Sequence, residues 1–285
     1  MNIFNEQING KKDWAEIYQS IPAFKPLVEF IFGKENLPLA EIENLTPGTN
    51  AVFKVGEYVI KIFAPVESGY NQTSDLQTEL FAMKRVKESP KVIADGFVDD
   101  KYLFNYMIME YIHGVEVVEA VKTMTDEEKV ELGRKLRQIC DSMNTPCEPF
   151  HDGNRYNCWD NYPEKFKAER LNYIQTHDFG EKVFVHGDLC LDNMLLKDGE
   201  LYILDFADAV HAPVCYEHAL VAFACEFDPA LLKGFFTGYT NESFTEMLFN
   251  GMLLHDFGGA ILRELGEFDS LESLKELIKR SVKLT

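Results

Sequence analysis

The feature that most constrains this chain is residues 185–206, which read VHGDLCLDNMLLKDGELYILDF. Two short apolar runs flank the turn KDGE at 197–200, and Asp-Gly between apolar runs is a strong signal for a β-hairpin. Because a hairpin brings its two ends together, we expect Asp188 and Asn193 at one end to meet Asp205 at the other. Carboxylate and amide oxygens suit Mg²⁺, which shares its coordination shell with phosphates. The stretch therefore predicts a magnesium site at the mouth of a hairpin.

The order of these residues resembles the catalytic loop of kinases, in which an Asp base precedes an Asn and, after a hairpin, a metal-binding Asp-Phe. The His-Gly-Asp opening at 186–188 is similar to the aminoglycoside phosphotransferase family, where protein kinases carry His-Arg-Asp. The resemblance implies that Asp188 is the catalytic base and that Asn193 and Asp205 hold Mg²⁺. The alternative is a surface hairpin whose Asp and Asn residues only form turns.

A lysine and a glutamate upstream support the kinase interpretation. Residues 51–55 and 58–63 are predicted to form two strands, and Lys61 lies among apolar residues of the second. It resembles the strand lysine of kinases that contacts the α- and β-phosphates. Residues 74–88 are predicted to form a helix, and Glu79 falls on its apolar face. Because a buried carboxylate is costly without a partner, we expect Glu79 to pair with Lys61.

The other nucleotide contacts follow from the resemblance. The loop at 46–50 lacks both G-x-G-x-x-G and the P-loop pattern G-x-x-x-x-G-K-[ST], so the chain is not a P-loop protein. In this loop, backbone amides and the Thr49 hydroxyl could hold phosphate oxygens. Residues 109–114 resemble the hinge, where the adenine would bond to the Glu110 carbonyl and the Ile112 amide. The donor would be ATP or GTP, and the sequence does not distinguish them.

The order of predicted elements indicates the fold. Strands are expected at 92–98 and 103–109, and helices at 125–143, from Pro163 onward, near 229–239, at 244–265 and at 271–284. The class is α+β, a two-lobed protein-kinase-like fold with a small antiparallel N-lobe sheet, one key helix and a larger, mostly helical C-lobe. We expect residues 1–110 to form the nucleotide-binding lobe, with peripheral N-terminal helices, and residues 111–285 to carry the catalytic loop and the substrate site.

Four residues are candidate substrate contacts. Trp159 could stack on a cationic sugar and Asp160 could pair with it, although an Asp cap beside a core Trp is the alternative. Asp208 follows the metal-binding Asp-Phe, and Glu217 stands where the family more often has Asp. No activation segment or A-P-E signature follows the Asp-Phe pair, which argues against a protein substrate.

Charge and cysteine usage narrow the partners and the compartment. The 285 residues include 28 Lys and Arg against 47 Asp and Glu, a net charge of -19. This argues against nucleic acid and favours a cationic substrate, although acidity that only aids solubility is an alternative. The six cysteines include no C-x-x-C pair, which argues against a zinc site and for a reducing cytoplasm. We expect no signal peptide, no membrane span and a monomer.

The sequence therefore predicts an ATP- or GTP-dependent phosphotransferase that uses Mg²⁺ and acts on a hydroxyl of a small cationic substrate, an aminoglycoside-type antibiotic. A metabolic kinase of the same fold, acting on choline, homoserine or a ketosamine, is the first alternative. A catalytically inactive nucleotide-binding module is the second. A hairpin protein unrelated to kinases is the third.

Overall fold

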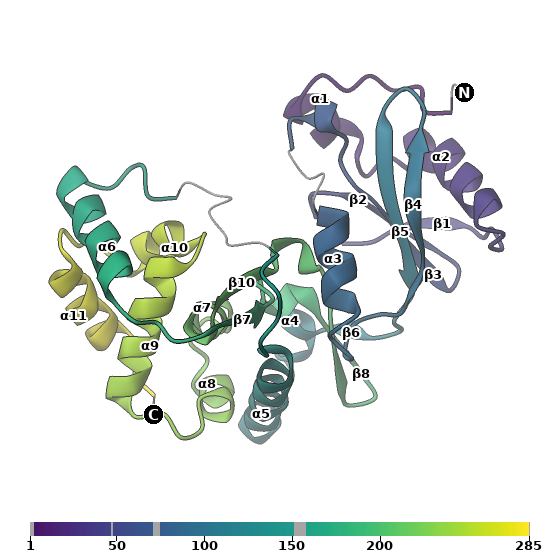
Figure 1. Cartoon of the computed structure of the whole chain (residues 1–285). Helices are drawn as coiled ribbons and strands as arrows, with labels where there is room; N and C mark the ends of the chain where they lie inside the picture. The colour runs from purple at the N-terminus through teal and green to yellow at the C-terminus, as the bar shows by residue number, and fades with distance from the viewer. Residues whose placement is uncertain (1–2, 47, 71–74, 151–157, 285) are drawn as a thin grey trace. The chain divides into compact units, whose positions relative to one another are not determined.

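The computed structural model describes residues 3–46, 48–70, 75–150 and 158–284. The chain divides into two compact units, Met1–His113 and Gly114–Thr285. The first is built around an antiparallel sheet, and the second is mostly helical (Figure 1). This combination confirms the predicted α+β class.

The first unit holds a five-stranded antiparallel sheet with strand order β1-β2-β3-β5-β4. Its strands are β1 (Ile42–Asn44), β2 (Ala51–Val55), β3 (Tyr58–Ile62), β4 (Val92–Asp99) and β5 (Leu103–Glu110). The hairpin predicted from residues 51–63 is present, with Val55 paired to Tyr58 across Gly56, whose φ is 61°. All strands predicted in this part of the chain are confirmed.

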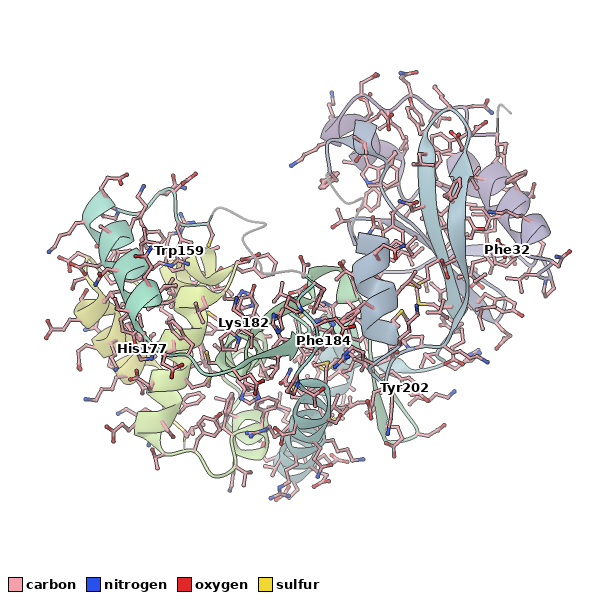
Figure 2. All side chains as sticks on the ribbon, in the orientation of Figure 1. Phe32, Trp159, His177, Lys182, Phe184 and Tyr202 are labelled. Carbon is pink, nitrogen blue, oxygen red and sulfur yellow. The ribbon has the colours of Figure 1, made fainter. Side chains whose placement is uncertain are left out.

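Alternation along the strands gives the sheet two buried faces. On β5, Phe104, Tyr106 and Ile108 face one core, while Met107 and Met109 face another. The first core is closed by α1 (Lys11–Ile17) and α2 (Ile21–Lys34), from which Phe32 points toward the sheet (Figure 2). The second is closed by α3 (Asp75–Met83). Because side chains alternate, Lys61 on β3 faces α3, whereas its neighbours Ile60 and Ile62 face the other core.

Helix α3 is shorter than predicted. It ends at Met83, not at residue 88, and Ser74 at its predicted start lies outside the described residues. The chain then turns toward β4, and the Ser89 hydroxyl donates to the Val86 carbonyl at 2.8 Å. Pro90 follows directly, and the residue before a proline is disfavoured in helical conformation. The helix was predicted too long because the apolar pattern of the sequence continues to Val86, beyond the last helical residue.

The second unit combines helices with two small antiparallel sheets, β10-β7 and β6-β8-β9. Its strands are β6 (Val115–Glu116), β7 (Lys182–Val185), β8 (Met194–Lys197), β9 (Glu200–Ile203) and β10 (Val210–Pro213). Its helices are α4 (Val117–Ala120), α5 (Asp126–Met143), α6 (Glu164–Thr176), α7 (Val214–Ala224), α8 (Pro229–Phe235), α9 (Asn241–Leu254), α10 (Gly258–Leu265) and α11 (Leu271–Ser281), with short 3-10 turns η2 (Leu191–Asn193) and η3 (Phe206–Asp208). None of the helices formed by the described residues is long and apolar enough to cross a membrane.

The single helix predicted at 244–265 is wrong, because the structure breaks it into α9 and α10. His255 ends α9 in an extended conformation, with ψ 138°. A Cβ at Gly258 would lie 1.9 Å from the Met252 carbonyl oxygen, so the chain folds back on itself there at a distance that only glycine allows. Strand β10, which pairs with β7, was not predicted, since its residues carry no local strand signal of their own.

Candidate active site

The predicted hairpin forms as expected and brings its ends together. Strands β8 and β9 pair with Met194 opposite Ile203, and the turn residues Asp198 and Gly199 have φ angles of 52° and 82°. Two left-handed turn residues suit the twist of a tight hairpin. At its mouth the Leu204 amide donates to the Asn193 carbonyl at 2.9 Å, which places Asn193 beside the residue that precedes Asp205.

Asp188 lies at the same mouth, held by Asn193. The Asn193 side-chain nitrogen donates to the Asp188 carbonyl at 2.8 Å and to its carboxylate Oδ2 at 3.1 Å. Burial, together with the nearby Asp208 and Asp205 carboxylates, raises the pKa of Asp188 to about 7. The three acids therefore lie close enough to repel one another in the absence of a cation.

This arrangement suits a magnesium ion. Asp205 is exposed and sits in the left-handed region, with φ 56° and ψ 72°, a conformation that is costly for a residue with a side chain. The amide nitrogen of Asn193 is used on Asp188, which leaves its oxygen to face a cation. Across the described part of the chain, no three His, Cys, Asp or Glu side chains form a complete metal-ligand set. Magnesium does not require one, because it is usually held by one or two carboxylates together with substrate phosphates.

Glu217 on α7 anchors the loop that carries Asp188. It is fully buried, and its carboxylate accepts hydrogen bonds from the backbone amides of His186 and of Gly187, the latter at 3.4 Å. The Asn144 side chain also donates to it at 3.5 Å. A side chain with no exposed surface is not placed to touch a substrate, so we replace the predicted substrate contact at Glu217 with a positioning role.

Gly187 brings the loop against the segment that follows the hairpin. Its φ is 82°, and a Cβ there would lie 2.1 Å from the Asp208 carbonyl oxygen. Only glycine fits such a contact. Asp208 is half-buried, and its carboxylate contributes to the raised pKa of Asp188. His186 links the loop to the end of the hairpin. Its Nε2 lies 2.8 Å from the Leu204 carbonyl, and its Nδ1 accepts from the Asp188 amide at 3.2 Å.

In the first unit, the predicted ion pair between Lys61 and Glu79 is present. Lys61 Nζ and Glu79 Oε1 are 2.6 Å apart, and the two residues are only 5% and 1% exposed. The pair links β3 to α3 across the core that contains Met107 and Met109. Because a buried charge without its partner is strongly destabilising, each residue orients the other.

The remaining predicted nucleotide contacts lie in the first unit. Thr49 is exposed just before β2, and its carbonyl accepts from the Trp14 indole nitrogen at 2.9 Å. Glu110 ends β5 and exchanges hydrogen bonds with Lys91, its amide donating to the Lys91 carbonyl at 3.0 Å. Ile112 is buried. Their contacts with a nucleotide stay predictions.

Sequence comparison matches residues 48–249 to the phosphotransferase enzyme family (APH). The matched segment contains Lys61, Glu79, Asp188, Asn193 and Asp205, and it covers well over half of the chain. The chain belongs to this family. The predicted resemblance is thereby confirmed, and the protein is a small-molecule phosphotransferase. No curated protein matches it in sequence.

Solved structures show the same fold for the phosphotransferase. An aminoglycoside 2'-phosphotransferase-IIIa in its GDP complex is similar at 16% identity and a TM-score of 0.58, over 92% of this chain and 98% of the other. An amicoumacin kinase in complex with AMP-PNP and Ca²⁺ matches at 14% identity and a TM-score of 0.56, over 90% and 94%. A choline/ethanolamine kinase family protein from Mesorhizobium loti matches at 17% identity and a TM-score of 0.55, over 85% and 87%.

The phosphotransferase buries Trp159, contrary to the role of stacking on a substrate. Trp159 is 8% exposed, and its ring packs against Tyr162 and Phe166, with centroids 5.2 and 6.1 Å away. The Arg170 guanidinium lies 4.1 Å from the ring centroid. These contacts favour the alternative of a core tryptophan. Asp160 beside it is exposed, and its contact with a substrate stays a prediction.

Sequence reasoning about the phosphotransferase missed His255. Its ring stacks on Tyr216 with centroids 4.1 Å apart, and its Nδ1 accepts from the Phe257 amide at 3.0 Å. Burial lowers the pKa of His255 to about 3, and the Gly187 backbone acts in the opposite direction. The stacked ring thus connects the break between α9 and α10 to α7, which carries Tyr216 and Glu217. No local pattern identifies it, because its neighbours come from distant parts of the sequence.

Glu217 gives the phosphotransferase a testable pH dependence. Burial raises the pKa of Glu217 to about 7 from 4.5, while the His186 and Gly187 amides lower it. Because the pKa of Glu217 is higher in the folded than in the unfolded state, the protonated side chain contributes to the free energy of unfolding. This contribution is fully present below pH 4.5 and is lost as pH rises through 7. The shift corresponds to about 3 kcal/mol. The Glu217→Gln side chain stays neutral at every pH. Between about pH 5 and pH 8, we therefore expect the parent to lose about 2–3 kcal/mol more of its free energy of unfolding than the variant loses.

The measurement is urea unfolding of both proteins at the two pH values. Both will share the pH dependence of the other carboxylates, so the difference isolates residue 217. Equal losses in the parent and the variant would show that Glu217 does not change its protonation on folding.

Proposed function

We propose that this phosphotransferase transfers the γ-phosphate of ATP or GTP to a hydroxyl of a small cationic substrate of the aminoglycoside type. The observation that carries the proposal is the loop in which Asn193 holds Asp188 while Glu217 accepts hydrogen bonds from the backbone amides of His186 and Gly187. Such a loop fixes a carboxylate in one place, and phosphoryl transfer depends mainly on positioning and on charge neutralisation.

The residues take distinct roles in this proposal. Lys61 contacts the α- and β-phosphates, and Glu79 fixes the lysine through their bond of 2.6 Å. Thr49 contacts phosphate oxygens, and the backbone of Glu110 and Ile112 binds the nucleobase of the donor. Asp188 orients the substrate hydroxyl and accepts its proton. A carboxyl group whose pKa is raised to about 7 is a stronger base at neutral pH than an ordinary aspartate.

Asn193 and Asp205 would hold Mg²⁺. The repulsion that raises the pKa of Asp188 supports a cation at this point, because the Asp205 and Asp208 carboxylates both contribute to it. When bound, the ion neutralises charge on the phosphates.

Two observations bear on the substrate. The net charge of -19 favours a cation, which an acidic surface attracts. The similarity to an aminoglycoside 2'-phosphotransferase supports an aminoglycoside. The similarity to a choline/ethanolamine kinase family protein supports a second candidate, a metabolic kinase acting on choline or a related amine. Both candidates use the same catalytic residues.

We further propose that the protein works as a monomer in the cytoplasm. Its six cysteines carry no C-x-x-C pattern, and scattered thiols are typical of a reducing compartment. Sedimentation of the purified chain would test the oligomeric state.

A screen for substrate-dependent release of ADP or GDP tests the function. Aminoglycosides, choline, homoserine and a ketosamine are each incubated with ATP or with GTP, and release of ADP or GDP is followed. We expect turnover with an aminoglycoside, together with phosphate transfer to the substrate seen by mass spectrometry. Turnover with choline, homoserine or the ketosamine alone would establish the metabolic alternative. Tight nucleotide binding with no turnover on any substrate would establish the inactive module.

A further inference from the structure

A cavity of the first unit is lined by residues from the C-terminal end of α3, from strand β4 and from the segment that joins them. Its volume is about 550 Å³, within the range of small-molecule sites. Leu80, Met83, Val86 and Ile93 contribute apolar surface to its lining. No role proposed above uses this cavity.

The rim of the cavity is basic. Lys84, Arg85, Lys87 and Lys91 line it, against one carboxylate, Asp95. The four cations fall within eight residues of a chain that carries 47 acids and 28 bases. A local excess of positive charge in so acidic a protein is not expected from composition.

The side chains of the three lysines on this rim have no ion-pair partner among the described residues. Lys84, Lys87 and Lys91 are exposed, and among the described residues none of their side chains forms an ion pair. Some exposed or half-buried cations elsewhere in the chain do pair with the abundant acids, as Lys54 does with Glu43 at 2.8 Å. Three adjacent unpaired ammonium groups around a concave apolar surface are suited to an anion with an apolar body.

We propose that this cavity binds a small organic phosphate, with the phosphate on the lysine rim and the apolar group against Leu80, Met83 and Ile93. Three cations favour a doubly charged phosphate over a singly charged carboxylate, because the attraction grows with the ligand's charge. The proposal does not rest on the proposed function, since it concerns a different set of residues.

The site adjoins two parts of the nucleotide-binding machinery. Leu80 and Met83 lie on α3, which also carries Glu79. The Lys91 amide donates to the Glu110 carboxylate at 2.9 Å, and the Lys91 carbonyl accepts from the Glu110 amide at 3.0 Å. A side-chain substitution at Lys91 leaves those backbone bonds in place. Variants of the lysine rim therefore change the charge of the cavity without removing a contact of the nucleotide residues.

The test compares naphthyl phosphate with naphthol, which has the same apolar body without the phosphate. Binding to the full chain is measured by titration calorimetry, with and without ATP present. We expect naphthyl phosphate to bind and naphthol to bind at least about tenfold more weakly. We also expect slower amide hydrogen exchange in peptides that cover residues 80–95.

The triple variant Lys84→Ser, Lys87→Ser, Lys91→Ser should weaken naphthyl phosphate binding about tenfold, because each exposed charge contributes a fraction of that factor. The matched control is Lys279→Ser, Arg280→Ser, Lys283→Ser, which removes three exposed cations from the C-terminal end of the chain. It should bind like the parent. Equal loss in both triple variants, equal binding of naphthol, or exchange slowed only outside residues 80–95 would each overturn the proposal. All six positions are exposed, so both variants should fold, which a thermal melt checks.

Discussion

Replacing Asp188 with asparagine will lower turnover by about 10²- to 10⁴-fold, the range that a positioned general base contributes. The isosteric change keeps the contact with Asn193 while removing the carboxylate that would accept the substrate proton. Nucleotide affinity should stay close to that of the parent, because in our proposal Asp188 touches the hydroxyl and not the donor. Steady-state kinetics on the substrate found in the screen and calorimetry with ATP or GTP measure the two quantities.

Asp192→Asn is the matched control for this experiment. Asp192 lies in the same loop, is exposed and has no proposed contact with nucleotide or metal. It should retain nearly full turnover while removing the same unit of charge. Asp188→Asn should not lose stability, since the repulsion from Asp205 and Asp208 that raises the pKa of Asp188 disappears with the charge. Turnover near the parental rate in Asp188→Asn would show that another group is the base.

Lys61→Ala will have two separate effects, one on stability and one on the nucleotide. It leaves the Glu79 carboxylate buried without Lys61, only 1% exposed, so the free energy of unfolding should fall by about 3–5 kcal/mol. It also removes the cation that contacts the phosphates, so nucleotide affinity should fall about ten- to a hundredfold, as a hydrogen bond to a charged group contributes ~1.5–3 kcal/mol. Urea unfolding and calorimetry measure the two effects.

The double variant Lys61→Met, Glu79→Leu separates them. Replacing a buried ion pair with apolar residues of similar volume is often neutral or stabilising, so the double variant should regain most of the lost stability. Its nucleotide affinity should stay low, because no cation has returned. If affinity recovers together with stability, Lys61 supports the fold of the first unit and does not contact the nucleotide.

Local chemistry made much of the site predictable. The hairpin at 194–203 follows from Asp198-Gly199, two residues that adopt positive φ at little cost, and its formation places Asn193 at the same mouth as Asp205. The pairing of Lys61 with Glu79 follows from two periodicities, alternation on β3 and the apolar face of α3. Both signals act between residues close in sequence or on regular elements.

What stayed hidden depended on residues far apart in the chain. The anchoring of His186 by Glu217, and the contact of His255 with Tyr216, join segments separated by tens of residues. The sequence shows Trp159 only as an aromatic residue in a polar loop. Its packing against Tyr162 and Phe166 in the folded chain is what buries it.

The sequence by itself determined most of the strands and helices, the hairpin and the set of side chains that we propose to carry the chemistry. Turn residues, alternation and apolar faces are local properties, and a short stretch of chain expresses them wherever it lies. The tertiary structure alone decided where α3 ends, where the helix predicted at 244–265 breaks, and that Glu217 holds the catalytic loop from within the core. These depend on how the backbone folds back against itself. The Met252 carbonyl at Gly258 and the Asp208 carbonyl at Gly187 set the space available to a side chain.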